Sequence, residues 1–167
     1  MHFDFYFDEH QINQLSYEAF AWRKRIVSKL PPHFSDKDNA WVLFDYLARQ
    51  VTYGKQSDAY SQTIIGPLSR GNHVSVCEGI AKSYKFLCDE AGIPCIIVFG
   101  DVNFGPGHAG SHAWNIIDTR SGLRHVDVTA ELEYAHYNGK ATQTDFLHSD
   151  KDMKKYSWDR RSTPSCY

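Results

Sequence analysis

No stretch of this 167-residue sequence approaches the roughly 20 apolar residues that are needed to cross a bilayer. Its start, Met1-His2-Phe3-Asp4, has neither the basic segment nor the apolar core of a signal peptide. No basic block stands out either, since 18 Lys and Arg face 20 Asp and Glu. The sequence therefore predicts a soluble protein that binds neither nucleic acid nor a membrane surface, and it leaves the compartment open.

Cysteine is also scarce for a chain of this length, and the four residues are too few and too unevenly spaced for a disulfide scaffold. Most are predicted to be free thiols, and one pair involving Cys166 is left open. Apolar residues, by contrast, make up 42% of the chain and aromatics 14%, which is typical of one globular domain with a real core.

Hydrophobic spacing predicts two helices in the N-terminal part. The first runs from Ser16 to Leu30 and is stopped by Pro31-Pro32. The second follows Ser35, which with Asp38 resembles a capping box, and it continues to about Val51. The chain then loses its period over a long Gly- and Ser-containing stretch at 54–76, a length that is usually functional in compact domains.

A third amphipathic helix is predicted from Cys77 to Ala91, with Gly92 as its C-terminal cap. Residues 95–99 form an apolar, β-branched run that fits a buried strand, and the runs at 112–118 and 123–129 read as a β-hairpin. From Ala130 onward the sequence is mixed and polar, and no further element is predicted there.

Cys77 has the setting of a reactive thiol, because it lies where an irregular segment meets the first turn of a helix. Unpaired backbone N–H groups and the helix dipole favour a thiolate at that place. Cys88 falls on the apolar face of the same helix and Cys95 in the apolar strand, so both are interpreted as packing residues.

A general base for that thiol has to come from elsewhere, and His112 lies at the start of a strand in Gly-Ser-His-Ala-Trp-Asn. Side chains alternate along strands, so any odd register sum puts His112 on the same hairpin face as Asp127. Pairing of residue 118 with 121 gives a sum of 239, and pairing with 123 gives 241. Either register allows Asp127 to hold the imidazole.

The same residue types do not form a recognisable metal site. His108 and His112 are spaced H-x3-H, but they flank Gly110 in a Gly-rich loop, and no HExxH helix is present. Cys88 and Cys95 are spaced more widely than the cysteines of zinc knuckles, and no EF-hand loop is visible. The sequence therefore predicts no metal and no cofactor.

Three motifs, in this order, resemble the core of the transglutaminase-like superfamily, particularly its bacterial members. They are the segment 76–81 (VCEGIA) with 87–95 (LCDEAGIPC), the segment 112–115 (HAWN) and the segment 125–129 (HVDVT). The resemblance implies an α+β, papain-like architecture in which a nucleophile helix packs against an antiparallel β-sheet. Many relatives continue the last motif with Trp and acidic residues, whereas Ala130 and Glu131 follow here, a departure that bears on the substrate groove.

Carried over by position, the resemblance implies Cys77 as nucleophile, His112 as base and acid, and Asp127 as the residue that orients the imidazole. For the oxyanion hole the candidates are the Cys77 backbone N–H with a side chain from Tyr53, Tyr60 or Gln62. Candidates for the substrate groove are Trp114 and Glu78.

The implied reaction is acyl transfer on a protein or peptide amide through a thioester. Water as acceptor gives a cysteine protease or amidase, which is slightly favoured here, and a lysine amine gives a transglutaminase. The alternative is a non-catalytic protein-binding module on the same fold. We expect one domain over 1–167, with a helical lead-in (1–34), a catalytic core (35–130) and a C-terminal extension (131–167). A place within a longer extracellular bacterial protein fits this reading, and the oligomeric state is left open.

Overall fold

The structure is a computed structural model that describes residues 9–54, 60–69 and 73–167. In chain order, its elements are α1 (Glu9–Val27), α2 (Asp36–Gln50), β1 (Thr52–Tyr53), α3 (Ile65–Ser69), β2 (Val74–Ser75), α4 (Cys77–Glu90), β3 (Cys95–Asn103), β4 (Ala109–Asp118), β5 (Leu123–Val126), α5 (Val128–Asn138), β6 (Phe146–His148) and β7 (Tyr156–Trp158).

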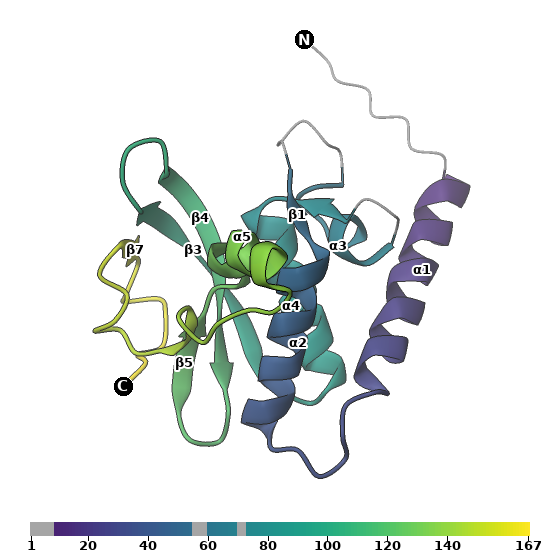
Figure 1. The fold of residues 1–167 in the computed structure, drawn as a ribbon, viewed down its shortest axis with the longest axis horizontal. Helices are drawn as coiled ribbons and strands as arrows, with labels where there is room; N and C mark the ends of the chain where they lie inside the picture. The colour runs from purple at the N-terminus through teal and green to yellow at the C-terminus, as the bar shows by residue number, and fades with distance from the viewer. Residues whose placement is uncertain (1–8, 55–59, 70–72) are drawn as a thin grey trace.

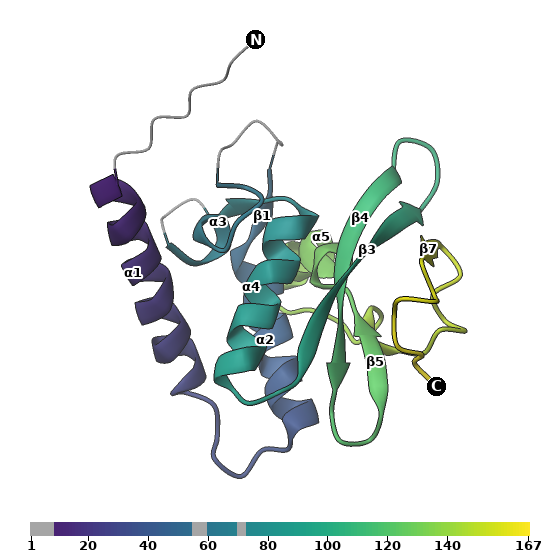
Figure 2. The ribbon, with the colours of Figure 1, turned by 180° about the vertical axis from the view of Figure 1, so that it is seen from behind.

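A five-stranded antiparallel sheet in the order β6-β5-β4-β3-β7 forms one side of the molecule, and the helices lie together on the other (Figure 1). The chain after β6, residues 149–167, is called the C-terminal segment below. It covers the outer face of this sheet, as the reverse view shows (Figure 2). A second, two-stranded sheet pairs β1 with β2 in parallel. The fold is therefore the predicted α+β class, with the helix that begins at Cys77 packed against an antiparallel sheet.

The two faces of the sheet bury different parts of the chain. On the helical face, Asn115 of β4 donates from Nδ2 to the Ala81 carbonyl of α4 at 3.0 Å, and Ile117 joins the main core. On the outer face, Trp114 and Ile116 pack with Met153 and other residues of the C-terminal segment. Residues that alternate along β4 thus hold the helices on one side and the C-terminal segment on the other.

The second helix begins as its sequence predicts. The Asp38 backbone N–H donates to Ser35 Oγ at 3.2 Å, and the Ser35 hydroxyl donates to Asp38 Oδ2 at 2.6 Å. The first of these bonds satisfies a backbone donor that the first turn would leave open, and the second joins the two side chains. On its buried face, the Ala40 carbonyl accepts a hydrogen bond from the Tyr84 hydroxyl of α4 at 3.0 Å.

Four sequence predictions about helices, strands and loops are corrected by the structure. The predicted strand at 123–129 ends at Val126, because Asp127 caps the helix that begins at Val128. The first helix starts earlier and ends earlier than predicted, at Glu9 and Val27. The long loop contains α3 and parts of the small sheet, while residues 55–59 and 70–72 of that predicted loop lie outside the described part of the chain. The region after Ala130 is not irregular, because α5 occupies residues 128–138.

In the part of the chain that the structure describes, none of the helices has the length and apolar character of a membrane span.

Candidate active site

Cys77 is the first residue of α4 and is half-buried. The N-cap residue before it, Val76, makes no side-chain hydrogen bond to the helix, so backbone N–H groups of the first turn stay directed at the helix entrance. Gly79 in this turn leaves room for the neighbouring segment, because a Cβ there would come within 2.3 Å of the Ser61 carbonyl oxygen. The local sequence therefore places a thiol at a positively polarised helix end.

The small parallel sheet brings Tyr53 to the same place. Tyr53 pairs with Ser75, two residues before the thiol, and the Gly54 N–H donates to the Ser75 carbonyl at 2.9 Å. The Tyr53 hydroxyl lies near the Cys77 thiol and the Cys77 backbone N–H, and its interactions with them shift the pKa values of both side chains. Burial, followed by the charge and hydrogen bond of the thiol group, raises the pKa of Tyr53, so its hydroxyl stays a donor.

The His112 ring lies between the thiol and a carboxylate. Its Nε2 donates to Asp127 Oδ2 at 2.7 Å, and the ring also lies close enough to the Cys77 thiol to interact with it. Because Nε2 is engaged by the carboxylate, the nitrogen that faces Cys77 is Nδ1. Both residues of the His–Asp pair are shielded from water, with His112 8% and Asp127 3% exposed.

The hairpin register accounts for this meeting. Asp118 pairs with Leu123, which is the sum of 241 that the sequence allowed. Asp127 itself follows the last residue of β5 and serves as the N-cap of α5, with Oδ1 accepting the backbone N–H groups of Thr129 at 3.0 Å and Ala130 at 3.4 Å. One carboxylate oxygen therefore fixes the helix start, and the other faces the imidazole.

These contacts shift the titration of the thiol and the imidazole in opposite directions. Burial alone would raise the pKa of Cys77, but hydrogen bonds from His112, the Ala113 N–H and Tyr53, together with the His112 charge, lower that pKa. Burial likewise opposes the charged form of His112, yet its hydrogen bonds to Asp127 and Cys77 raise its pKa to about 10. The arrangement favours a thiolate and imidazolium pair at neutral pH.

A residue that the sequence analysis missed completes the surroundings of Asp127. The hydroxyl of Tyr156, on β7, donates to Asp127 Oδ2 at 2.8 Å, so this oxygen receives two donors. Nothing in the sequence indicated that Tyr156 would reach Asp127. The helix α5 beside Asp127 did have a sequence signal, which is Asp127 followed by the helix formers of 130–135.

Of the remaining candidates, Tyr53 reaches the thiol, while an oxyanion role for Tyr60 and Gln62 stays a prediction. The carbonyl of Gln62 accepts a hydrogen bond from Lys82 Nζ at 3.0 Å. Glu78 is half-buried beside Cys77 and pairs with Lys82 at 2.6 Å, and its place in a groove also stays a prediction.

The prediction that Trp114 lines a substrate groove is wrong. Its side chain is 1% exposed and lies on the outer face of the sheet, where it stacks on His112 with ring centroids 6.0 Å apart. His112 and Trp114 are two residues apart on β4 and so lie on the same face of the sheet, where Tyr156 and Trp158 cover Trp114.

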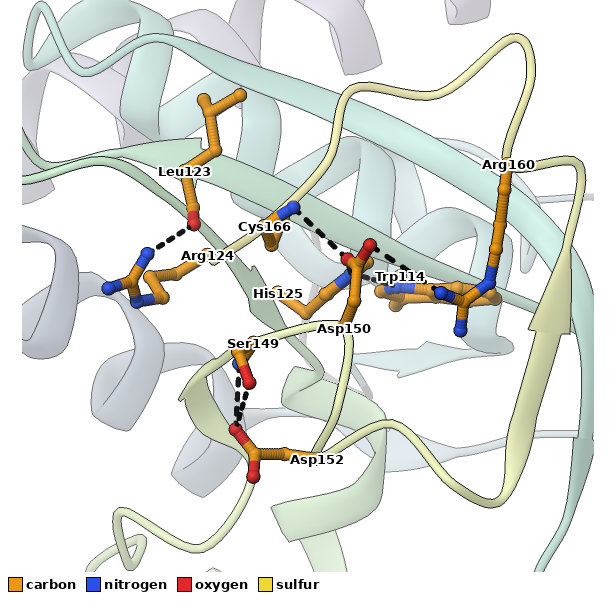
Figure 3. A network of polar contacts seen from close by, with 9 residues as sticks. All are labelled: Trp114, Leu123, Arg124, His125, Ser149, Asp150, Asp152, Arg160 and Cys166. Carbon is orange, nitrogen blue, oxygen red and sulfur yellow. Dashed lines mark hydrogen bonds and ion pairs between the residues drawn. The ribbon is translucent and has the colours of Figure 1, made fainter.

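A second cysteine, histidine and aspartate meet beneath the C-terminal segment. One potential metal-ligand atom from each of His125, Asp150 and Cys166 lies within 4.8 Å of the other two (Figure 3). His125 Nδ1 accepts from the Trp114 indole N–H at 3.0 Å, which places the imidazole proton on Nε2, and this N–H donates to Asp150 Oδ1 at 2.9 Å. Both ring nitrogens are thereby engaged, and Nε2 has no lone pair to give to a metal or to a thiol proton.

This second group has the properties of a structural network. Cys166 is 2% exposed, and burial, with the Asp150 charge, raises the pKa of its thiol to about 12. Its backbone N–H donates to Asp150 Oδ1 at 3.1 Å. The chain of bonds from Trp114 through His125 and Asp150 to Cys166 ties the C-terminal segment to the sheet. All four cysteines are free in the structure, and Cys88 and Cys95 are buried, as predicted.

The fold is of the transglutaminase-like, papain-like type, and solved structures bear this out. A transglutaminase crystal structure aligns with a TM-score of 0.56 and 14% identity over 76% of this chain and 34% of that one. A candidate cysteine protease from Cytophaga hutchinsonii aligns with a TM-score of 0.51 and 18% identity, over 81% of this chain and 46% of that one.

The chain thus spans about a third of the first matching protein and less than half of the second. No protein-family model and no curated protein matches the sequence. At these identities the likeness concerns the fold alone.

Proposed function

We propose that this protein is a cysteine-nucleophile acyl-transfer enzyme that acts on protein or peptide amides through a thioester. The observation that carries the proposal is the place of the His112 ring, which is hydrogen bonded to Asp127 Oδ2 at 2.7 Å and lies near enough to the Cys77 thiol for each group to shift the pKa of the other. A nucleophile, a proton-transfer group and a group that orients it are thereby within reach of one another. The fold shared with a transglutaminase and a candidate cysteine protease supports the same class of chemistry.

In the acylation step, the Cys77 thiolate attacks the amide carbonyl carbon, and a C–S bond forms. The negative charge moves to the carbonyl oxygen, where the Cys77 backbone N–H and the Tyr53 hydroxyl are donors. His112 gives its Nδ1 proton to the amide nitrogen, the C–N bond breaks, and the amine leaves. Asp127 keeps the ring oriented and stabilises its positive charge before the transfer.

In the deacylation step, neutral His112 takes a proton from the second nucleophile as that nucleophile attacks the thioester carbonyl. The C–S bond breaks, and the thiolate and imidazolium return. Water as the second nucleophile makes the reaction hydrolysis, and a primary amine makes it transamidation. The same residues serve both reactions, so the acceptor is a property to be measured.

Mass spectrometry of the protein incubated with a glutamine-bearing protein, with and without a primary amine, tests this proposal. Deamidation, amine incorporation and backbone cleavage shift the mass of the substrate differently, and a thioester adds the acyl group to the peptide that contains Cys77. A substrate of unchanged mass, with Cys77 no more reactive than Cys88, would instead point to a non-catalytic binding module.

Replacing Tyr53 with phenylalanine is expected to lower kcat by about 100-fold, the usual effect of removing one oxyanion donor. The change also removes a donor to the thiolate, so the Cys77 pKa should rise. Steady-state kinetics and iodoacetamide labelling measure the two effects. Tyr134→Phe is the matched control, since Tyr134 is 49% exposed and Tyr53 is 55% exposed. Equal kcat values for the two variants would remove Tyr53 from the oxyanion hole.

A further inference from the structure

The Asp127 carboxylate is held by protein donors on both oxygens. Oδ1 caps α5, while Oδ2 accepts from His112 Nε2 at 2.7 Å and from the Tyr156 hydroxyl at 2.8 Å. The group is 3% exposed, so water does not supply alternative partners. The direction in which Oδ2 points is therefore set by two side chains, of which only one is the imidazole.

The Tyr156 ring is fixed in place by its neighbours. It packs edge-on against the rings of Trp114 and Phe104, with ring centroids 5.2 Å and 5.5 Å apart. Its centroid lies 6.0 Å from that of the His112 ring. Its backbone pairs with Val102 at the edge of the sheet. Since rings packed on several sides lose little further freedom when they donate a hydrogen bond, the hydroxyl is a preorganised donor.

The segment that carries Tyr156 is itself anchored to the sheet. Asp150 accepts from His125 Nε2 and from the Cys166 N–H, and the Asp150 N–H donates to the Cys166 carbonyl at 2.8 Å. Arg160 pairs with Asp150 at 3.6 Å (Figure 3). Its guanidinium also lies over the Trp158 ring, 4.3 Å from the ring centroid. This network lies on the outer face of the sheet and includes Trp114, which hydrogen bonds to His125 and stacks on His112.

We propose that Tyr156 is a positioning residue of the active site, whose hydroxyl keeps Asp127 Oδ2 directed at His112 Nε2, and that the C-terminal segment thereby forms part of that site. The inference rests on the proposed function. Without the hydroxyl, Oδ2 keeps a single donor, and the carboxylate gains freedom to turn away from the ring. The imidazolium is then held less well, and the thiolate beside it loses its counter-charge more easily.

Other carboxyl groups lie near Asp127, so its negative charge needs a hydrogen-bond donor such as the Tyr156 hydroxyl. The backbone carbonyl of Asp145 accepts the Asp127 N–H at 2.9 Å. Burial, followed by the charges of Asp127 and Glu131, raises the pKa of the Asp145 carboxyl to about 6. Lys155 is a nearby cation, and its Nζ lies over the Phe104 ring, 5.6 Å from the ring centroid. The tyrosine hydroxyl stays protonated at working pH, because burial and the Asp127 charge raise its pKa.

The test is Tyr156→Phe, which keeps the ring packing and removes only the hydroxyl. We expect iodoacetamide to label Cys77 about tenfold more slowly than in the unmodified protein at pH 5.5 and at an equal rate at pH 9.5. We also expect kcat to fall about tenfold while KM changes less than twofold. Thermal unfolding of each variant checks that the fold is kept.

Tyr84→Phe is the matched control, because Tyr84 is a buried tyrosine that donates one hydrogen bond, to the Ala40 carbonyl, away from Asp127. It should lose stability without a change in the pH dependence of labelling. Equal labelling profiles for Tyr156→Phe and the unmodified protein would overturn the positioning role. If Cys77 of the unmodified protein is no more reactive than Cys88 or Cys95, the proposed function itself fails, which is a distinct result.

Discussion

Replacing Cys77 with alanine is expected to abolish acyl transfer, with a loss on the order of 10⁴-fold or more in kcat/KM. The thiolate is the atom that bonds to the acyl group, so neither His112 nor Asp127 has a function in its absence. Because Cys77 is half-buried at a helix end, the substitution should leave the fold intact. The measurement is turnover of a glutamine-bearing protein, followed by mass spectrometry.

Cys88→Ala is the control for this experiment, because it removes a fully buried thiol from the same helix. It should cost about 1 kcal/mol in unfolding free energy, through a small cavity, and leave kcat/KM nearly unchanged. If Cys77→Ala kept its activity, the reaction would not pass through a thioester at this residue.

Replacing Asp127 with asparagine is expected to lower kcat/KM on the order of 10³-fold. Every group that hydrogen bonds with the carboxylate is a donor: His112 Nε2 and Tyr156 on Oδ2, and the backbone N–H groups of Thr129 and Ala130 on Oδ1. An asparagine has one acceptor, so its NH₂ group meets donors in either orientation. The imidazole would then lose its orientation, or α5 would lose its cap.

The same substitution should lower the unfolding free energy by about 1–3 kcal/mol, as for a buried group left with an unmatched donor. Ser35→Ala separates the loss of stability from the loss of activity. It removes the N-cap of α2, far along the chain from the site, at a cost of about 1 kcal/mol in unfolding free energy. We expect this control to be less stable but fully active. An Asp127→Asn variant with ordinary activity would show that the carboxylate does not act through His112.

Local sequence patterns were sufficient to predict much of the candidate site. The capping pair of Ser35 and Asp38, the helix that begins at Cys77 and the hairpin register are all set by neighbours in the sequence. The alternation of strand side chains then limits how His112 and Asp127 can lie, since an odd register puts them on one face. These features need no knowledge of distant contacts.

What could not be predicted depends on tertiary packing. Trp114 was expected in a groove, but the C-terminal segment folds over the outer face of the sheet and buries it. Tyr156 reaches Asp127 only because β7 pairs with β3, more than 50 residues earlier in the chain. The helix after Asp127 did have a local signal, an Asp N-cap followed by helix formers, and polar composition concealed it.

The pH dependence of iodoacetamide labelling, resolved for each cysteine, tests the central claim most directly. The lowered pKa of Cys77 predicts that its labelling reaches its maximum at a lower pH than that of an ordinary thiol, while Cys88, whose thiol pKa is raised by burial, stays unlabelled. Turnover should fall again as the pH rises through the His112 pKa of about 10, because the imidazolium then has no proton for the leaving amine. A Cys77 that titrates like an ordinary thiol, near pH 8.5, would contradict the thiolate and imidazolium pair.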